Sequence, residues 1–416
     1  MGIKKYIILF LLCFAVRVQG QINLVMDNTL QNCPQIGVLL SNAGGTTAAK
    51  AHIIKDTLQS RCVRFQIQMQ GYSGTSSAYQ TFVDSGLQPH VVIGVDSVGV
   101  DPQPWIASLA DLATSVNSLL TTYPAIRILI LDNEEMNPSY HTGDLFDYCR
   151  IADTIHHICQ LHNVLLANGG FGNFFGISCY TFRWLKANYN QDTANAFASR
   201  VFLNGTSGGQ YTAANVPNSN PTLEAYFLGV DTIMKCTSFD ILNFHNYEPE
   251  GDSAYNPNTI TGISPNVWRF DIEAFKNGNT NKRRPIMINE TGQRYNSEPN
   301  LVTNMLANGF RLGLFFLDWW SGNGVALGAT PLTQNDGTIN TNGTAFKIIT
   351  NKPTYTRRRL EQLKLERISV LEHDFSLTVP KKIYFYSAHF KLDIFNAFGD
   401  GQFGEHIGLV DLDTIL

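Results

Sequence analysis

Three patterns that would indicate a function class directly are absent from this sequence of 416 residues. No GxGxxG follows the first apolar run that resembles a strand, so the usual dinucleotide-binding signal is missing. No CxxC pair indicates a metal site. The 34 acidic residues outnumber the 30 basic ones, so there is no positive surplus for nucleic acid or an anionic membrane. We therefore expect no metal, no organic cofactor and no nucleic acid partner.

Long apolar runs are also absent, except at the N-terminus. Residues 1–20 begin with Lys4 and Lys5, continue in an apolar stretch and end in Gly20, which is typical of a secretory signal peptide. Removing it leaves 27 basic and 34 acidic residues. No later run reaches the roughly 18 apolar residues that a membrane span needs. We expect a secreted, monomeric mature protein outside the membrane, with a lysosomal or vacuolar destination left open.

Cysteine is scarce, and the six cysteines that remain after removal of the signal are an even number. Disulfides form in the secretory route, but six cysteines allow 15 connectivities. The order of elements permits Cys33 to pair with Cys62, and Cys179 to pair with Cys236. We expect all six to be structural or free thiols rather than metal ligands.

Three N-glycosylation sequons begin at Asn204, Asn289 and Asn342. Asn204 and Asn342 lie in polar, glycine-rich stretches, where we expect glycans. Asn289 lies in an apolar run that resembles a strand, so we expect it to remain unmodified.

Apolar runs typical of buried strands recur eight times, with helical patterns between them. These runs begin at Ile36, Cys62, His90, Ile126, Asn163, Phe239, Pro285 and Leu312. Between them, residues 105–120 and 145–161 place apolar side chains at three- and four-residue steps. Eight strand–helix units predict an α/β fold, a closed (β/α)8 barrel over residues 21–370; an open doubly wound sheet is the alternative.

Two segments depart from the regular rhythm. A long insertion after the fifth strand, residues 171–235, is rich in Gly, Asn, Ser and aromatics. It is expected either to shape a substrate cleft or to be a surface decoration. Residues 355–371 are a candidate for the last barrel helix. The tail, 371–416, is a small appended strand segment, a disordered end or an error in the gene model.

Two glutamates end strand-like runs. Glu134 follows the fourth run and Glu290 ends the seventh. Barrel enzymes keep their catalytic groups at the carboxyl ends of the strands. A pair of carboxylates on two strands is the requirement of glycoside hydrolysis, where one acts as acid and the other as nucleophile.

Other polar and aromatic residues end neighbouring runs. Arg64 lies in the second run, and His245 and Tyr247 lie in the sixth. Arginine and tyrosine can donate hydrogen bonds to a carboxylate nucleophile. Trp319 and Trp320 end the eighth run and offer an aromatic face for a sugar ring. Neighbours on a strand point in opposite directions, so only one tryptophan can face inward, and Trp319 is the choice.

Together these residues resemble the clan of retaining glycosidases on (β/α)8 barrels, which includes cellulases, mannanases, xylosidases and plant-type β-1,3-glucanases. The resemblance covers about residues 33–345. It implies that Glu134, in the Asn133-Glu134 pair, is the acid/base and that Glu290, in Glu-x-Gly, is the nucleophile. It also implies that the remaining residues bind or support an oligo- or polysaccharide; they are Asn133, Arg64, His245, Tyr247, Trp319 and Trp320.

The implied activity is hydrolysis of β-linked glycans by double displacement. A transglycosylase on the same site, or a catalytically silent carbohydrate-binding barrel, are the alternatives. The sequence departs from the clan at Glu135, where many members have proline, and this carboxylate is a rival for the role of Glu134. A structural ion pair of Glu134 or Glu290 with Arg64 is the other alternative.

Overall fold

The computed structural model consists of two compact units, Met1–Pro353 and Thr354–Leu416, and each is described by itself. The residues that it describes are 36–41, 45–69, 72, 74–94, 108–136, 144–171, 177–201, 221–247, 267–278, 284–292, 299–311, 314, 316–322, 331–350, 383–386, 391–395 and 406–411. In the second unit, β9 (Ile383–Tyr386), β10 (Lys391–Phe395) and β11 (His406–Asp411) form an antiparallel sheet with β10 in the middle.

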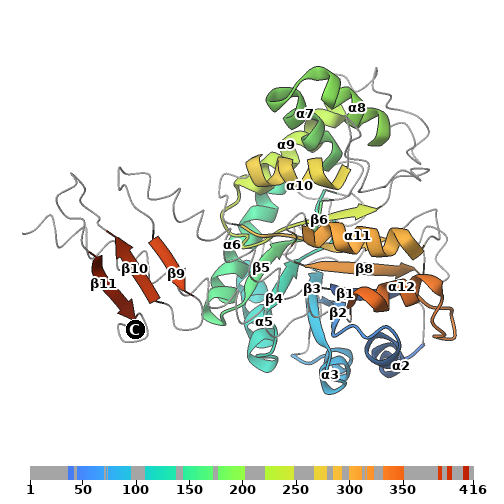
Figure 1. Ribbon diagram of the computed structural model, residues 1–416. Coiled ribbons are helices and arrows are strands. Elements are labelled where there is room, and N and C mark those ends of the chain that lie inside the picture. Colours follow the sequence, from blue (N-terminus) through green and yellow to red (C-terminus); the bar gives the residue numbers. More distant parts are fainter. Residues whose placement is uncertain are drawn as a thin grey trace, which may run out of the picture. The chain divides into compact units, whose positions relative to one another are not determined.

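Eight parallel strands form the centre of the first unit (Figure 1). They are β1 (Ile36–Ser41), β2 (Cys62–Gln68), β3 (Gln88–Gly94), β4 (Ile128–Leu131), β5 (Leu165–Asn168), β6 (Leu242–Tyr247), β7 (Ile286–Gly292) and β8 (Leu317–Gly322). Strand β1 pairs with both β2 and β8. Parallel bridges from Ala167 to Ile241 and from Phe171 to Phe244 join β5 to β6. The ring is therefore closed: the predicted (β/α)8 barrel is confirmed, and the open sheet is wrong.

Helices lie between the strands. They are α2 (Thr47–His52) with the π-helix η1 (Ile53–Thr57), α3 (Ser77–Asp84), α5 (Leu109–Thr122), α6 (Leu145–Leu161), α7 (Ser178–Asn188), α8 (Gln191–Val201), α9 (Pro221–Lys235), α10 (Val267–Gly278), α11 (Pro299–Arg311) and α12 (Thr341–Thr350). The helix after β8 is therefore α12, whereas residues 355–371 lie outside the described residues.

Helix α6 shows how the sequence produces these elements. Asp144 caps its first turn, because a side-chain oxygen accepts a hydrogen bond of 2.9 Å from the amide of Phe146. Its buried positions follow the helical repeat; they are Tyr148, Ile151, Ala152, Ile155 and Cys159. This apolar face predicts the helix, and the predicted bounds agree with the observed ones.

The insertion after β5 contributes α7, α8 and α9, which gather with α10 beside β6 (Figure 1). The Tyr180 ring on α7 stacks on Phe275 of α10, with ring centroids 5.6 Å apart. Phe275 stacks in turn on Phe244 of β6. The described helices of the insertion thus pack on the outer side of the barrel. Cleft shaping by residues 172–176 and 202–220 stays a prediction, since these lie outside the described residues.

The described cysteines and sequons correct two expectations. The five cysteines between Cys62 and Cys236 are thiols. Cys179 is buried in an apolar cluster with Phe182 and Phe197, so it does not form the expected pair with Cys236. Asn342 is fully buried, so the expected glycan there does not fit the folded chain. Cys33 and Asn204 lie outside the described residues. No described helix combines the length and apolarity that a membrane crossing needs.

Candidate active site

Glu134 lies in a tight turn directly after β4. Asp132 and Glu134 both have positive φ, 63° and 47°, in the left-handed region that residues with a side chain seldom adopt. The Asp132 carboxylate accepts a hydrogen bond of 2.9 Å from the Asn133 amide and so stabilises this turn. Such backbone strain gathers at functional sites. The turn presents Asn133 and Glu134 at the carboxyl end of the barrel.

Strand β7 carries a register irregularity where Glu290 lies. Along the pairing with β6, Phe244 lies opposite Ile288 but His245 lies opposite Glu290, so Asn289 is an extra residue. Neighbouring strand residues normally point to opposite faces. The bulge instead gives both Asn289 and Glu290 polar partners at this end of the barrel. Bulges beside active sites re-aim side chains in this way.

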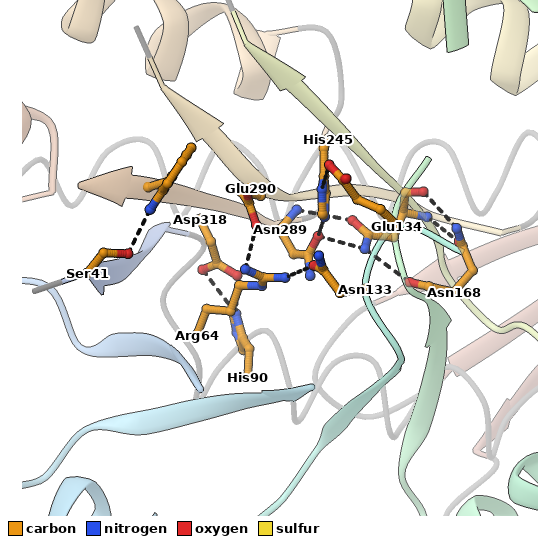
Figure 2. Close-up of polar contacts among 12 residues, drawn as sticks. Ser41, Arg64, His90, Asn133, Glu134, Asn168, His245, Asn289, Glu290 and Asp318 are labelled. Carbon is orange, nitrogen blue, oxygen red and sulfur yellow. Dashed lines mark hydrogen bonds and ion pairs between the residues drawn. The ribbon is translucent and has the colours of Figure 1, made fainter. Parts of the chain in front are cut away.

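Arg64 on β2 links the two halves of the site (Figure 2). Its Nη1 donates to Glu290 Oε2 at 2.6 Å, and its Nη2 donates a short hydrogen bond to Asn133 Oδ1. The side chain of Arg64 is 7% exposed and that of Glu290 is 13% exposed. In such a shielded place a charge-assisted hydrogen bond is strong and directional. Arg64 therefore compensates the charge of Glu290 and fixes its orientation relative to the turn after β4.

His245 on β6 contacts Glu134 (Figure 2). Its Nε2 lies 2.7 Å from Asn289 Oδ1, and its Nδ1 lies 3.0 Å from Glu134 Oε1. Because an amide oxygen only accepts, Nε2 carries a proton. Two acceptors cannot face each other, so Nδ1 and Glu134 share a further proton. Burial opposes a charged imidazole, but Glu290 and Glu134 outweigh it and raise the pKa of His245.

Gly170 leaves the space that His245 occupies. Its φ is +110°, and a Cβ added there would come within 2.4 Å of His245 Nε2. The left-handed backbone and the close approach of the ring both favour glycine at this position. The loop after β5 therefore helps to set the imidazole against Glu134.

The two carboxylates and the imidazole form a compact group. One carboxylate oxygen of Glu134, one of Glu290 and one ring nitrogen of His245 all lie within 4.8 Å of one another. Three such ligands could in principle hold a divalent cation. The guanidinium group of Arg64 already binds Glu290 and would repel a cation there. The arrangement therefore fits acid–base and nucleophilic chemistry better than metal binding.

Glu135, the rival carboxylate, lies elsewhere. It is 1% exposed, and its Oε1 accepts a hydrogen bond of 2.8 Å from Asn168 at the end of β5. Glu134, by contrast, contacts His245. Glu134 is thus the acid that contacts the group containing Glu290, and Glu135 binds Asn168.

The two tryptophans of β8 point in the directions opposite to those predicted. Trp319 is fully buried and packs edge-on against Phe346 of α12, so it points outward, and the choice of Trp319 is wrong. Trp320 is half-buried, lies on the opposite face of β8, and donates from Nε1 to Ser41 Oγ at 2.8 Å. Neighbouring residues of a strand point to opposite faces. Asp318 points into the barrel, where it contacts His90, so Trp320 points inward as well and Trp319 points outward. The side chain of Tyr247 lies outside the described residues.

A layer of buried asparagines was not predicted. Asn243 Nδ2 donates to Asn289 Oδ1 at 2.7 Å, and the backbone amide of Asn243 donates to Asn168 Oδ1 at 2.6 Å. These amides connect β5, β6 and β7 and fix the position of Asn289 Oδ1, which lies next to His245 Nε2. The available signal was the presence of asparagine within each of these strands, but asparagine in a sequence more often indicates a turn.

A buried ion pair also escaped prediction. His90 Nδ1 on β3 lies 3.0 Å from Asp318 Oδ2 on β8 (Figure 2). Burial opposes protonation, but Asp318 outweighs it and holds the pKa of His90 well above its ordinary value. A Cβ added at Gly37 would lie 2.0 Å from Asp318 Oδ1, so this glycine makes room for the acid. The His90–Asp318 pair therefore places two opposite charges next to each other inside the barrel.

Comparisons with known proteins concern the fold. No family model and no curated protein matches the sequence. Solved structures with a similar fold include a family 39 glycoside hydrolase from Bacteroides cellulosilyticus WH2, with 13% identity over 77% of this chain and a TM-score of 0.48; the match covers 64% of that protein. An endoglucanase from Thermotoga maritima matches with 12% identity over 77% of this chain and 99% of its own, TM-score 0.46.

An endo-β-1,3-glucanase of family 128 from Amycolatopsis mediterranei matches with 14% identity over 76% of this chain and 99% of its own, at a TM-score of 0.40. At these identities and TM-scores no family is defined for the chain, and the barrel is established by the pairing of its own strands.

Proposed function

We propose that this protein is a retaining glycoside hydrolase for β-linked glycans or glycosides, with Glu134 as acid/base and Glu290 as nucleophile. One observation carries the proposal: carboxylate oxygens from β4 and β7 lie within 4.8 Å of each other at the carboxyl end of a barrel. Retaining enzymes place their carboxyl groups about 5–5.5 Å apart, whereas inverting enzymes need about 6.5–9.5 Å to admit a water molecule.

In the first step, Glu290 attacks the anomeric carbon while Glu134 protonates the leaving oxygen. The proton shared with His245 is the one that Glu134 delivers. In the second step, Glu134 takes a proton from water, and this water releases the sugar from Glu290. His245 then stores the proton again beside Glu134, because its Nε2 stays anchored on Asn289.

Arg64 holds Glu290 in place during both steps. Its two hydrogen bonds run to Glu290 and Asn133, so one planar group sets the nucleophile relative to the turn that carries Glu134. We assign Asn133, His245 and Tyr247 to binding or supporting the sugar, and Trp320 to the aromatic contact at the rim. The N-terminal segment supports export, and we propose that the mature chain acts outside the cell as a monomer.

Hydrolysis of a panel of β-glucans, mannans, xylans and aryl β-glycosides tests the proposal. The expected result is release of sugar from at least one of them, its loss in Glu290→Gln, and its retention in the matched control Glu273→Gln on α10. Thermal unfolding of both variants checks that they fold. Turnover by Glu290→Gln at the wild-type rate would contradict the assignment.

The same panel separates the alternatives. Products longer than the substrate at high acceptor concentration would indicate a transglycosylase on this site. Binding to a glycan without any release of reducing sugar, in wild type and Glu290→Gln alike, would indicate a silent carbohydrate-binding barrel.

A further inference from the structure

Helix α6 meets the segment before β6 along a seam outside the proposed active site. Ser238 Oγ donates a short hydrogen bond to Asp153. One turn further along the helix, His156 Nε2 lies 3.2 Å from Asp240 Oδ1. Positions 149, 153 and 156 lie on one face of α6, since they are spaced by four and three residues.

This register places Cys149 opposite Cys236. The two thiols are close enough for each to shift the pKa of the other, although they are 87 positions apart in the sequence. Nearby packing fixes α9 on the start of α6: a Cβ at Gly229 would lie 2.6 Å from Met136 Cε and 2.9 Å from Leu145 Cδ1. The position of Cys149 beside Cys236 is therefore fixed by the two neighbouring polar pairs on α6 and by the close packing of α9 on α6.

The pair differs from the other described cysteines in exposure. Cys149 and Cys236 are each partly exposed, whereas Cys62, Cys159 and Cys179 are buried. Small oxidants in solution can therefore reach the pair.

The two thiols are also electronically unequal. The neighbouring Cys149 lowers the pKa of Cys236, and hydrogen bonds from Ser238 lower it further. Burial opposes both effects, and the resulting pKa of Cys236 is about 6. The neighbouring Cys236, followed by burial, raises the pKa of Cys149. At neutral pH Cys236 is therefore the better nucleophile of the two, because the thiolate is the reactive form.

We propose that Cys149 and Cys236 form a disulfide that ties α6 to the end of α9. An S–S bond is about 2.05 Å long, so the two neighbouring sulfurs must approach each other to form it. The cross-link encloses α7, α8 and α9. It therefore secures the long insertion to the helix that follows the Glu134 turn. In an oxidising compartment, such as the one predicted by the N-terminal segment, this bond would persist.

Oxidised glutathione, a small disulfide, supplies the oxidising equivalents. The Cys236 thiolate attacks one of its sulfurs, the S–S bond breaks, and one glutathione thiolate leaves. Cys149 then loses its proton and attacks the Cys236 sulfur of the mixed disulfide, which releases the second glutathione. Two protein thiols are oxidised by two electrons, and one glutathione disulfide is reduced to two thiols that take up the two protons.

Peptide mapping of the full-length folded protein tests this pairing. The protein is equilibrated with oxidised glutathione, alkylated under denaturing conditions without reductant, digested and analysed by mass spectrometry. The expected result is a peptide linking Cys149 to Cys236 that disappears on reduction, while Cys159 on the same helix is alkylated in both samples. Alkylation of both Cys149 and Cys236 in the oxidised sample, or linkage of either to another cysteine, would overturn the proposal.

Two single variants test the order of attack. In Cys149→Ser, Cys236 has no resolving partner and should accumulate as the glutathione mixed disulfide. In Cys236→Ser, Cys149 should react far more slowly with oxidised glutathione. Equal glutathione adducts on the two variants would refute the assignment of Cys236 as the attacking thiol.

Thermal unfolding of the wild type provides a measurement that does not depend on a variant. Closing a loop of this length predicts that reduction lowers the Tm by roughly 5–10 °C. A control with Cys149→Ser should show the same Tm with and without reductant. An oxidised wild type whose Tm does not respond to reduction would contradict the stabilising role of the bond.

Discussion

Because the carboxyl group of Asp271 on α10 is buried, we expect the free energy of unfolding to depend on pH. Its carboxyl group is fully buried and accepts hydrogen bonds from Thr181 Oγ1 at 2.7 Å and from Asn246 Nδ2 at 2.9 Å. Burial raises the pKa of Asp271 to about 7, against an ordinary value of 3.8, although the two hydrogen bonds partly oppose the shift. The group ties α7 and α10 to β6, one residue beyond His245.

Whether stability rises or falls with pH depends on whether the folded or the unfolded chain holds the Asp271 proton more tightly. Below pH 4 Asp271 is protonated in both the folded and the unfolded chain, so it contributes nothing to the pH dependence. Between pH 4 and 7 the unfolded chain releases the proton while the folded chain keeps it, so stability falls as pH rises. The difference of about 3 pKa units corresponds to about 4 kcal/mol of unfolding free energy, lost in full above pH 7.

Asp271→Asn isolates this effect. The amide can accept from Asn246 and donate to Thr181, as the protonated acid does, so we expect nearly wild-type stability at pH 4.5. At pH 8.5 the variant should be more stable than the wild type by about 3–4 kcal/mol, allowing about 1 kcal/mol for imperfect hydrogen bonds. Urea unfolding at both pH values measures the difference.

A matched control removes one carboxylate from an exposed place. Asp192→Asn lies on the exposed surface of α8 and should follow the wild-type pH profile. If the free energies of the wild type and Asp271→Asn differ by a constant amount, within about 0.5 kcal/mol, across this pH range, the account of Asp271 is refuted.

Three further predictions concern the proposed active site. Glu134→Gln should lower kcat/KM by about 10²–10⁴-fold on glycosides with poor leaving groups and much less on activated aryl glycosides, whereas Glu135→Gln should not show this leaving-group dependence; equal profiles would transfer the acid role. Arg64→Lys should lower kcat/KM by about 10–100-fold, because an ammonium group cannot hold Glu290 and Asn133 in one planar fork; full activity in this folded variant would argue against the bridge. Gly170→Ala should displace the imidazole and lower kcat by about 10²-fold with little change in KM, and wild-type kinetics would show that the ring does not position Glu134.

The fold could be predicted from sequence because buried parallel strands are near-continuous apolar runs. Runs such as ILIL of β4 are buried at every position, and their spacing by helical segments leaves few architectures. The same logic placed Glu134 and Glu290 at strand ends. It also placed Arg64 in the barrel at the site, where the structure joins it to Glu290.

The errors and omissions have a common cause, since they depend on distances between segments far apart in the chain. Choosing between Trp319 and Trp320 required knowing which alternate residues of β8 face into the barrel, and the sequence does not specify this. The bulge at Asn289 reverses the usual alternation, so the role of this asparagine could not be inferred from its position. The neighbour of Cys236 depends on how α9 packs on α6.

The most direct test of the central claim is the identity of the residue that becomes glycosylated during turnover. A 2-deoxy-2-fluoro glycoside with a good leaving group, of the sugar that the panel identifies, slows release of the covalent intermediate because fluorine disfavours an oxocarbenium-like transition state. The account predicts that mass spectrometry will find this sugar on the peptide that contains Glu290, and that Glu290→Gln will not be labelled. Turnover of a normal substrate with inversion of the anomeric configuration, or a label on another residue, would contradict it.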